Sequence, residues 1–450
     1  MGRAVAMFVG VLLLIDNVTG QPRMDREEDP QFIFFEPVNL VSTDPAASRV
    51  DIPYRINEGF FIPVRNTDSS FPSAFKRRGE ILIELLDSTG TSAARDISRF
   101  EAGAESSEET PERSRWYQNI VSFNVSPGTY KLIIELDDLE SERKFLSDKT
   151  AVVARAFGSS FEASTPVFIE WPATGAASER IVLQNWGRDL QFGKRAALFF
   201  GLNSEEQDGQ PVRVEYTISV KARPDDLPVL IVSDTLENIT RIPHASLSPF
   251  RSDEMVGYDM ATSERERCEG IIMPIGAERF PLRTFVFTAT IIRGSKKTTL
   301  TKLFRTVWPE MPLSLREVDY ALESLRYIVT EQQRDSLRRG SADERRDHLE
   351  QFWQTKDKTP ETAYNEVQAE YYRRVDHARR AFGTLREPDG SLTDRGRIFI
   401  LFGQPGAINR TLDPSSGFQE EWVYENLNKR FIFADKAKSG NYILVSSQTL

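Results

Sequence analysis

The chain has 450 residues, of which 40% are hydrophobic and 28% charged, and its formal net charge is −10 at pH 7. This length predicts about two to four domains, and the apolar fraction is enough for real cores. The acidic balance argues against a general binder of nucleic acid or of anionic membranes. The single cysteine, Cys268, cannot form a disulfide within the chain, so the fold must rely on its cores.

The N-terminus has the pattern of a secretory signal, because Arg3 is followed by a short apolar run over residues 4–15. We expect residues 1–20 to be removed after export, which leaves Gln21 first, and residues 21–30 to form a flexible segment. The alternative is an uncleaved membrane anchor. The run is shorter than the roughly 20 residues of a comfortable membrane span, so no integral span is expected after cleavage.

Residues 31–158 and 159–309 predict two antiparallel β-sandwich domains of the immunoglobulin-like kind. The clearest segment is the turn at residues 126–129, which leads into strict alternation of Leu132, Ile134 and Leu136. Residues 93–115 are predicted to form a solvated loop, and residues 238–269 a polar insertion. The expected strands are 32–35, 50–55, 60–65, 80–86, 116–125, 130–136, 151–156, 180–184, 196–201, 212–220, 229–232, 271–274, 283–292 and 298–306.

Residues 313–450 predict an α+β domain, with helices packed on a small antiparallel sheet. Two capping boxes, Ser314 with Glu317 and Ser341 with Glu344, predict two helices. A third helix is predicted from Thr359 to Gly383, on an apolar stripe with steps of three and four residues. Its helical spacing also predicts ion pairs of Glu370 with Arg373 and Arg374. The apolar run 397–402 then reads as a central strand, followed by short strands at 422–424, 431–433 and 442–445.

This region resembles the GWxTD-domain family, a bacterial family of exported proteins with β-sandwich domains ahead of the C-terminal module. The resemblance rests on Phe352-Trp353, residues 357–360, Asn365-Glu366, residues 370–375, residues 393–398 and Phe402-Gly403-Gln404-Pro405. The tryptophan that gives the family its name is replaced by Ser391, within Gly390-Ser391-Leu392-Thr393-Asp394. The resemblance implies an exported protein with the same domain order.

One polar group of residues in this domain is a candidate site. We expect Asp394 to pair with Arg373 or Arg374, and Arg395 to pair with Glu370. The functional interpretation is a polar pocket that binds a ligand or performs acid–base hydrolysis with Asp394, Glu370 and His377 as the catalytic groups. The alternative is a structural ion-pair network that fixes the helix to the sheet. The candidate binding or structural residues are Asn365, Glu366, Glu370, Tyr371, Arg373, Arg374, Thr393, Asp394, Arg395, Gly396, Gly403 and Pro405.

No cofactor or metal is expected, because His244, His348 and His377 lack a second histidine at ligand spacing. Neither a nucleophile elbow nor a nucleotide-binding glycine pattern is present in the sequence. Tyr371 and Tyr372 are predicted to belong to the core.

Three functions follow as hypotheses. The first is a non-catalytic structural or interaction protein of the cell envelope, periplasmic or extracellular, whose C-terminal domain docks a partner protein. The second is an exported hydrolase that uses Asp394, Glu370 and His377. The third is a carbohydrate- or peptide-binding protein that acts through its β domains, which exposed aromatic side chains on one sandwich face would favour.

Overall fold

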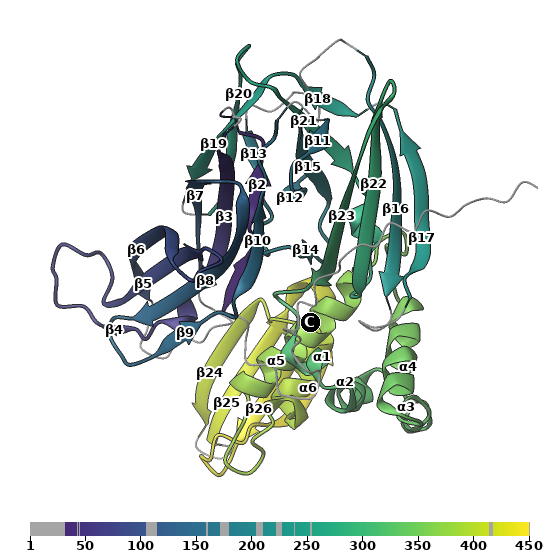
Figure 1. Ribbon diagram of the computed structural model, residues 1–450. Coiled ribbons are helices and arrows are strands. Elements are labelled where there is room, and N and C mark those ends of the chain that lie inside the picture. Colours follow the sequence, from purple (N-terminus) through teal and green to yellow (C-terminus); the bar gives the residue numbers. More distant parts are fainter. Residues whose placement is uncertain are drawn as a thin grey trace, which may run out of the picture. The chain divides into compact units, whose positions relative to one another are not determined.

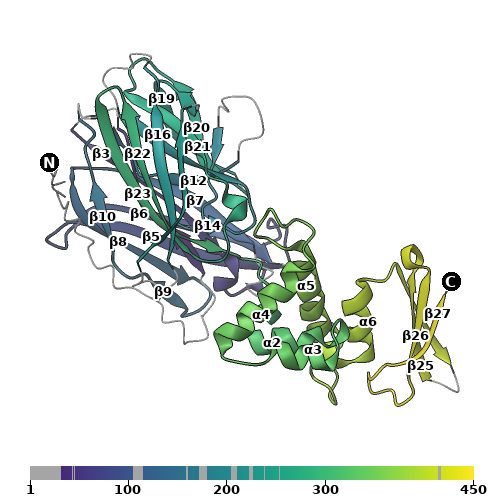
Figure 2. The same cartoon turned by 90° about the vertical axis from the view of Figure 1, so that its right-hand side faces the viewer.

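The structure is a computed structural model that describes residues 32–42, 44, 46–104, 115–158, 161–171, 180–203, 210–221, 227–237, 239–252, 254–413 and 417–449. The predicted signal peptide (1–20) and flexible segment (21–30) lie outside these residues. Contacts divide the chain into two compact units. The first contains the chain up to Leu190 with residues 195–275 and 283–305, and the second contains residues 191–194, 276–282 and 306–450. The units are described separately below (Figures 1 and 2).

The first unit begins with two antiparallel sheets that enclose a common core. In one sheet, β3 (Ser48–Asn57) pairs with β1 (Ile33–Phe35), β2 (Val38–Leu40) and β7 (Trp116–Val125). The other contains β4 (Val64–Arg65), β5 (Phe75–Leu86), β6 (Ser92–Ala104), β8 (Gly128–Asp138), β9 (Lys144–Leu146) and β10 (Thr150–Ala154). The predicted alternation of Leu132, Ile134 and Leu136 is confirmed, because all three lie in this core beside Ile52 and Ile83.

The remaining strands of this unit form three further antiparallel sheets. The first contains β11 (Glu162–Ala163), β12 (Val167–Glu170), β15 (Ala196–Asn203), β18 (Thr240–Ile242) and β21 (Cys268–Pro274). The second contains β13 (Arg180–Val182), β19 (Ala245–Arg251) and β20 (Val256–Thr262). The third contains β14 (Leu190–Gln191), β16 (Arg213–Lys221), β17 (Val229–Leu236), β22 (Thr284–Arg293) and β23 (Lys296–Val307), and Figure 1 shows β16, β17, β22 and β23 side by side.

The two predicted β regions share contacts within the first unit. Val38 and Leu40 of β2 belong to a second core together with Phe199 of β15. The Asn185 Nδ2 also donates a hydrogen bond to the Tyr54 carbonyl oxygen at 2.9 Å. The predicted boundary between two sandwich domains near residue 158 stays a prediction.

The helices of the second unit are α1 (Leu313–Arg316), α2 (Val318–Ser324), α3 (Glu331–Leu337), α4 (Ala342–Gln354), α5 (Glu366–Ala381) and α6 (Asp394–Phe402), with 3₁₀ turns η3 (Leu325–Tyr327) and η4 (Gly390–Leu392). The capping box of Ser341 and Glu344 is confirmed at the start of α4. The predicted apolar stripe is also present, since Tyr371, Val375 and Ala378 of α5 are buried in one helical core. Within the described residues, none of the helices combines the length and the apolar character needed to cross a membrane.

A four-stranded antiparallel sheet completes the second unit, in the order β24 (Ala407–Asp413), β25 (Gly417–Tyr424), β26 (Lys429–Asp435) and β27 (Ile443–Thr449). Figure 2 shows α6 between α5 and this sheet. Phe399 of α6 packs in a core with Trp422 and Phe433. The fold class predicted from sequence is confirmed: mainly antiparallel β structure, followed by helices on a small antiparallel sheet.

The prediction of a central strand at residues 397–402 is wrong, because this segment forms the second half of α6. Thr393 is the N-cap, and its Oγ1 accepts a hydrogen bond from the Gly396 N–H at 3.0 Å. Ile398 and Phe399 face the sheet core, whereas Ile400 faces the helical core. A helix buried on two sides has the same continuous apolar run as a buried strand, so periodicity alone could not separate them.

Several other local predictions are corrected by the structure. The third helix begins at Glu366 and not at Thr359, because Asn365 is its N-cap, and it ends at Ala381. Ser314 does not cap a helix with its side chain, and its hydroxyl donates to the Tyr372 carbonyl oxygen. Most of the predicted loop 93–115 that is described belongs to β6, whereas residues 105–114 lie outside the described residues. The predicted polar insertion contains β18, β19 and β20.

Candidate functional site

The turn at residues 390–396 is compact because two glycines allow its backbone to approach its neighbours closely. A Cβ on Gly396 would lie 2.0 Å from the Gly390 carbonyl oxygen, and a Cβ on Gly390 would lie 2.2 Å from the Ala378 carbonyl oxygen. Neither position can therefore accept a larger residue without movement of the backbone. The turn places Thr393 and Asp394 at the start of α6 and holds them against the end of α5.

Asp394 joins the start of α6 to the edge strand of the sheet. Its Oδ2 accepts a hydrogen bond from the Leu444 N–H at 2.9 Å, and its Oδ1 accepts one from Arg397 Nη2 at 3.1 Å. The predicted pairing of Asp394 with Arg373 or Arg374 is wrong, because α6 is a helix and brings its own residue Arg397 within reach. The side chain of Asp394 is 32% exposed, so this contact is only partly buried.

Arg395 contacts the sheet and not Glu370, so that predicted pairing is also wrong. Its guanidinium donates to Glu420 Oε2 at 3.3 Å and lies 4.3 Å from the centre of the Tyr442 ring. Glu420 is almost fully buried and also accepts from Arg410 at 2.9 Å and from the Trp422 indole N–H at 3.3 Å. Two arginines and an indole therefore offset the cost of burying this carboxylate.

The predicted ion pairs within α5 are confirmed as surface pairs. Glu370 lies 2.7 Å from Arg374 and 3.5 Å from Arg373, at the helical spacings of four and three residues. Arg373 also donates to the Tyr364 hydroxyl at 2.7 Å. The Glu370 side chain is 49% exposed, so each pair contributes only a few tenths of a kcal/mol, about 0.3–0.5 for helix pairs at this spacing.

Asp376 and His377 take part in different contacts. Asp376 is buried, and its two carboxylate oxygens accept the backbone N–H groups of Leu313 and Ser314 at 2.7 and 2.9 Å, at the start of α1. The His377 ring stacks on Phe399 of α6 with the ring centres 4.3 Å apart. Asp376 therefore joins α5 to the start of α1, whereas His377 packs against α6.

The other candidate residues hold the helices in place. Asn365 caps α5 through a bond from the Gln368 N–H at 2.9 Å and donates to the Trp353 carbonyl oxygen at 2.9 Å. Glu366 accepts from the Thr359 hydroxyl at 2.7 Å. Tyr371 lies in the helical core, as predicted, and its hydroxyl donates to the Ser324 carbonyl oxygen at 2.6 Å.

Gly403 closes the end of α6. Gly403 has a φ of 79°, which ordinary side chains rarely adopt, and its carbonyl oxygen accepts the Tyr424 hydroxyl at 2.8 Å. Pro405 lies in the connection between α6 and β24. Gly403 and Pro405 therefore end the helix and lead the chain into the sheet.

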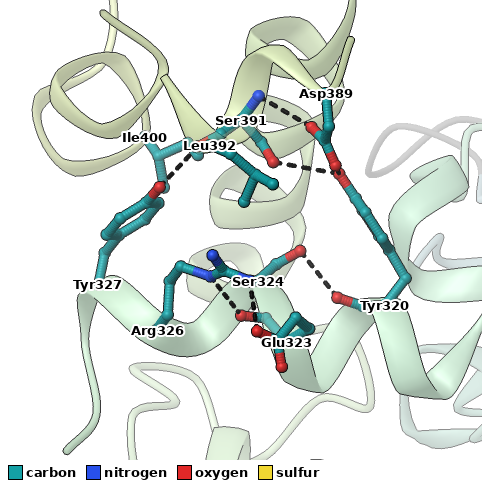
Figure 3. A pocket seen from close by; sticks show the side chains of 9 residues that line it. All are labelled: Tyr320, Glu323, Ser324, Arg326, Tyr327, Asp389, Ser391, Leu392 and Ile400. Atoms are coloured by element: carbon teal, nitrogen blue, oxygen red, sulfur yellow. Dashed lines mark hydrogen bonds and ion pairs between the residues drawn. The ribbon is translucent and has the colours of Figure 1, made fainter. Parts of the chain in front are cut away.

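A pocket of about 240 Å³ lies beside the turn, and sequence analysis missed it (Figure 3). Its lining comes from α2, η3, the turn and α6, and consists of Tyr320, Glu323, Ser324, Arg326, Tyr327, Asp389, Ser391, Leu392 and Ile400. Nothing in the periodicity singled out Tyr320 and Tyr327. Their spacing of seven residues, two helical turns, was the one available sign that they share a face.

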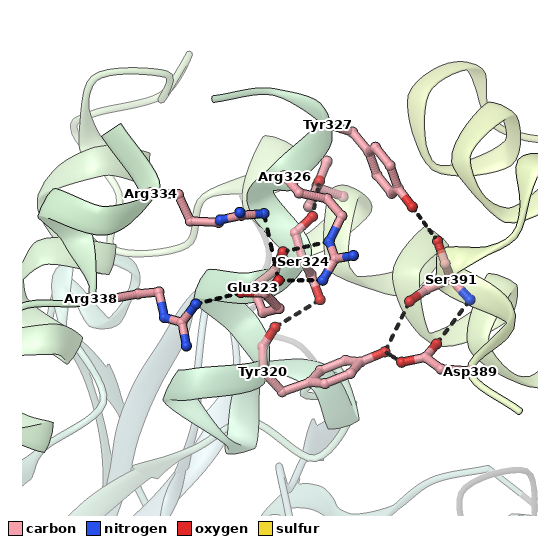
Figure 4. Close-up of polar contacts among 10 residues, drawn as sticks. Tyr320, Glu323, Ser324, Arg326, Tyr327, Arg334, Arg338, Asp389 and Ser391 are labelled. Carbon is pink, nitrogen blue, oxygen red and sulfur yellow. Dashed lines mark hydrogen bonds and ion pairs between the residues drawn. The ribbon is translucent and has the colours of Figure 1, made fainter. Parts of the chain in front are cut away.

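Hydrogen bonds fix the polar side of this pocket (Figure 4). The Tyr320 hydroxyl donates to Asp389 Oδ2 at 2.8 Å, and the Ser391 N–H donates to Asp389 Oδ1 at 2.9 Å. The Tyr327 hydroxyl donates to the Ser391 carbonyl oxygen at 2.8 Å. Burial, with the bond to Asp389 as a smaller cause, raises the pKa of Tyr320 to about 12, so its hydroxyl stays protonated at neutral pH.

Glu323 forms the charged edge of the pocket. It pairs with Arg326 and with Arg338, the latter at 2.8 Å, and lies 3.5 Å from Arg334. Its negative charge is therefore balanced by arginines on η3 and α3. Within the described residues, no group of three or more histidine, cysteine or acidic side chains is arranged to hold a metal ion.

The second unit is thus an α+β domain built around a Gly-x-x-Thr-Asp turn that joins a helical core to a small sheet. Residues 290–450 match the family model described as the GWxTD domain, so this part of the chain is a GWxTD domain. No curated protein matches the chain. The position of the family's tryptophan is occupied by Ser391, which lines the pocket.

Proposed function

We propose that this protein is an exported component of the cell envelope that acts without catalysis, and that its C-terminal domain docks a partner protein. Export is supported by the charged and apolar pattern of residues 1–20. Docking is supported by one feature of the C-terminal sheet, an exposed apolar strip that we define as Ile408, Leu412 and Phe418.

The strip is the observation that carries the proposal. Ile408 pairs with Trp422 and Leu412 pairs with Phe418 across β24 and β25, so alternation places all of them on one face of the sheet. Trp422 is buried, and its ring centre lies 5.4 Å from that of Phe382 at the end of α5. By contrast, Ile408, Leu412 and Phe418 are 46%, 63% and 43% exposed. Leu412 and Phe418 are direct cross-strand neighbours, whereas Arg410 lies between Ile408 and Leu412 on this face. Exposed apolar side chains gathered on a sheet are typical of a surface that contacts another protein.

The candidate acid–base groups support the non-catalytic part of the proposal. Asp394 contacts Leu444 and Arg397, whereas Glu370 contacts arginines of its own helix. His377 stacks on Phe399. A general acid and a general base must both reach the same substrate, whereas Asp394 and Glu370 contact partners on different elements.

No observation favours sugar or peptide binding by the β sheets. Among the described residues, the aromatic side chains that are exposed are Trp171 in the first unit and Phe418 in the second. An exposed cluster of aromatic rings on one sandwich face, which that hypothesis requires, is therefore not among the described residues.

The test compares two exposed leucines on strands. Full-length tagged protein captures partners from solubilised envelope, the partner is identified by mass spectrometry, and the affinity of the purified pair is measured. Leu412→Lys in the strip is compared with Leu146→Lys on β9, whose leucine is 64% exposed. We expect Leu412→Lys to weaken binding at least about tenfold, as loss of a central apolar contact does, and Leu146→Lys to leave it unchanged.

Two results would contradict the proposal. One is equal affinity for both variants and the wild type, which would place the contact elsewhere. The other is a protein that captures no envelope partner under conditions in which its fold, followed by circular dichroism, is intact.

A further inference from the structure

We infer that the pocket at Ser391 is a binding site for a flat aromatic ring that carries an N–H or O–H donor, with indole as the type. This inference goes beyond the proposed docking and involves different residues, since the exposed strip lies on β24 and β25. It rests on the volume of the pocket, on Ser391 in its lining and on the chemistry of the other lining residues.

The size of the pocket fits a bicyclic ring. An engineered apolar cavity of about 150 Å³ binds benzene, which has six ring atoms. Scaling by atom number gives about 225 Å³ for the nine atoms of indole, on the same basis. The pocket here measures about 240 Å³, so its volume matches that of such a ring.

The wall residue explains why the space is open. The Gly-Trp-x-Thr-Asp motif that names the family has an indole at the position of Ser391. Ser391 is only 3% exposed, so this position faces the interior and a large side chain here would have to enter the domain. Its Oγ lies 3.2 Å from the Tyr320 hydroxyl, at the pocket wall. A serine therefore leaves unfilled a volume that an aromatic ring from outside the chain can occupy.

The lining offers both ring contacts and hydrogen-bond acceptors. Figure 3 shows Tyr320 and Tyr327 on opposite sides of the pocket, with Ser391 and Leu392 between them on the turn. Ile400 and Leu392 supply aliphatic contacts. The Ser391 Oγ and the Tyr320 hydroxyl oxygen both have lone pairs that can accept from an indole N–H or a phenol O–H.

The charges of the lining argue against an ionic ligand. Asp389 already accepts from the Tyr320 hydroxyl and the Ser391 N–H. Glu323 is balanced by Arg326 and Arg338. A neutral ring with one donor satisfies the remaining acceptor without leaving a charge unpaired, whereas an ion would disturb these pairs.

The experiment uses the full-length protein and 5-fluoroindole, followed by ¹⁹F NMR titration. A second arm uses N-acetyl-tryptophanamide, which presents the same ring as a polypeptide does. We expect saturable binding of fluoroindole to the wild type, and at least about tenfold weaker binding to Ser391→Trp, whose own indole fills the pocket. The matched control is Ser336→Trp on the exposed face of α3, which should bind as the wild type does.

A rim variant covers the case in which Ser391→Trp does not fold. Leu392 lines the pocket but is 39% exposed, so Leu392→Trp can cover the entrance with little change to the interior, and it should also weaken binding. Saturable binding of fluoroindole supports the inference. Binding of the tryptophan amide as tight as that of fluoroindole identifies a polypeptide side chain as the source. The inference is overturned if the wild type does not bind fluoroindole, or if folded Ser391→Trp and Leu392→Trp both bind it as the wild type does.

Failure of this test is distinct from failure of the docking proposal. Loss of ring binding leaves the exposed strip and its leucine variants unaffected. Conversely, a strip that captures no partner leaves the fluoroindole titration unchanged.

Discussion

Asp394→Ala is predicted to loosen the sheet edge of the C-terminal domain. The substitution removes the acceptor of the Leu444 N–H and the partner of Arg397. It also removes a negative charge from the first turn of α6, where the helix dipole favours one. The perturbation is local, because each of these contacts joins α6 to itself or to β27.

The magnitude follows from these three contacts. A hydrogen bond to a charged group contributes roughly 1.5–3 kcal/mol, a charge at a helix N-terminus about 0.3–1 kcal/mol, and a partly exposed ion pair about 0–1 kcal/mol. Because the contacts share one side chain they are not additive, and we expect a loss of about 2–3 kcal/mol. This is less than the roughly 3–5 kcal/mol for breaking a buried pair, because the carboxylate is 32% exposed.

The assay is hydrogen exchange at the Leu444 amide in the full-length protein. Since a chain with two units does not unfold in one step, a local probe is more informative than a global melting curve. A loss of 2–3 kcal/mol corresponds to exchange that is roughly 30- to 150-fold faster. Asp394→Asn keeps an acceptor oxygen and should lose about 1 kcal/mol, since the neutral hydrogen bond remains. Glu370→Ala removes only surface pairs and should not change exchange at Leu444.

One result would refute this reasoning. If the Leu444 amide of Asp394→Ala exchanged as slowly as in the wild type, the carboxylate would not stabilise the sheet edge. A functional role for Asp394 would then become the better explanation of its position at the start of α6.

Two further predictions concern buried groups. Glu420→Gln should destabilise the C-terminal sheet by about 2–4 kcal/mol, because Arg395 and Arg410 lose their shared carboxylate. Hydrogen exchange of the β25 and β26 amides measures this loss, and unchanged exchange would show that the arginines are satisfied without the carboxylate. Burial raises the pKa of the Cys268 thiol from 9.0 to about 12, so the native protein should resist alkylation at pH 8 and react only when unfolded. Because the pKa of this thiol is higher in the folded protein than in the unfolded chain, the thiol contributes stability below pH 9 that is lost between about pH 9 and 12. Rapid alkylation of the folded protein at pH 8 would contradict the raised pKa of Cys268.

The local sequence was enough to predict a structure where the interaction joins residues that are close together in the chain and allows only one arrangement. The capping box of Ser341 and Glu344 was predicted correctly, because its two hydrogen bonds form between residues three apart. The strand Trp116–Val125 was also predicted with its observed bounds. The pairing of Glu370 with Arg374 followed from helical spacing alone.

Sequence was not enough where a residue is defined by partners far along the chain. Asp394 bonds Leu444, fifty residues away, and Arg395 bonds Glu420. No spacing rule connects these residues, since the contacts exist only once β25 and β27 have folded against α6. The predicted partners on α5 were chosen by charge alone. In a chain rich in arginine and glutamate, each charged residue has many possible partners of opposite charge.

The sequence by itself determined the fold class and the stripe of α5, because alternation and helical periodicity act over a few residues. Only the tertiary structure decided that residues 397–402 are helical, since burial against two cores gives the same apolar run in a helix and in a strand. It also decided that Ser391, at the position of the family's tryptophan, lines a pocket. A cavity depends on whether the surrounding walls collapse, and that is a property of packing which the order of the residues does not express.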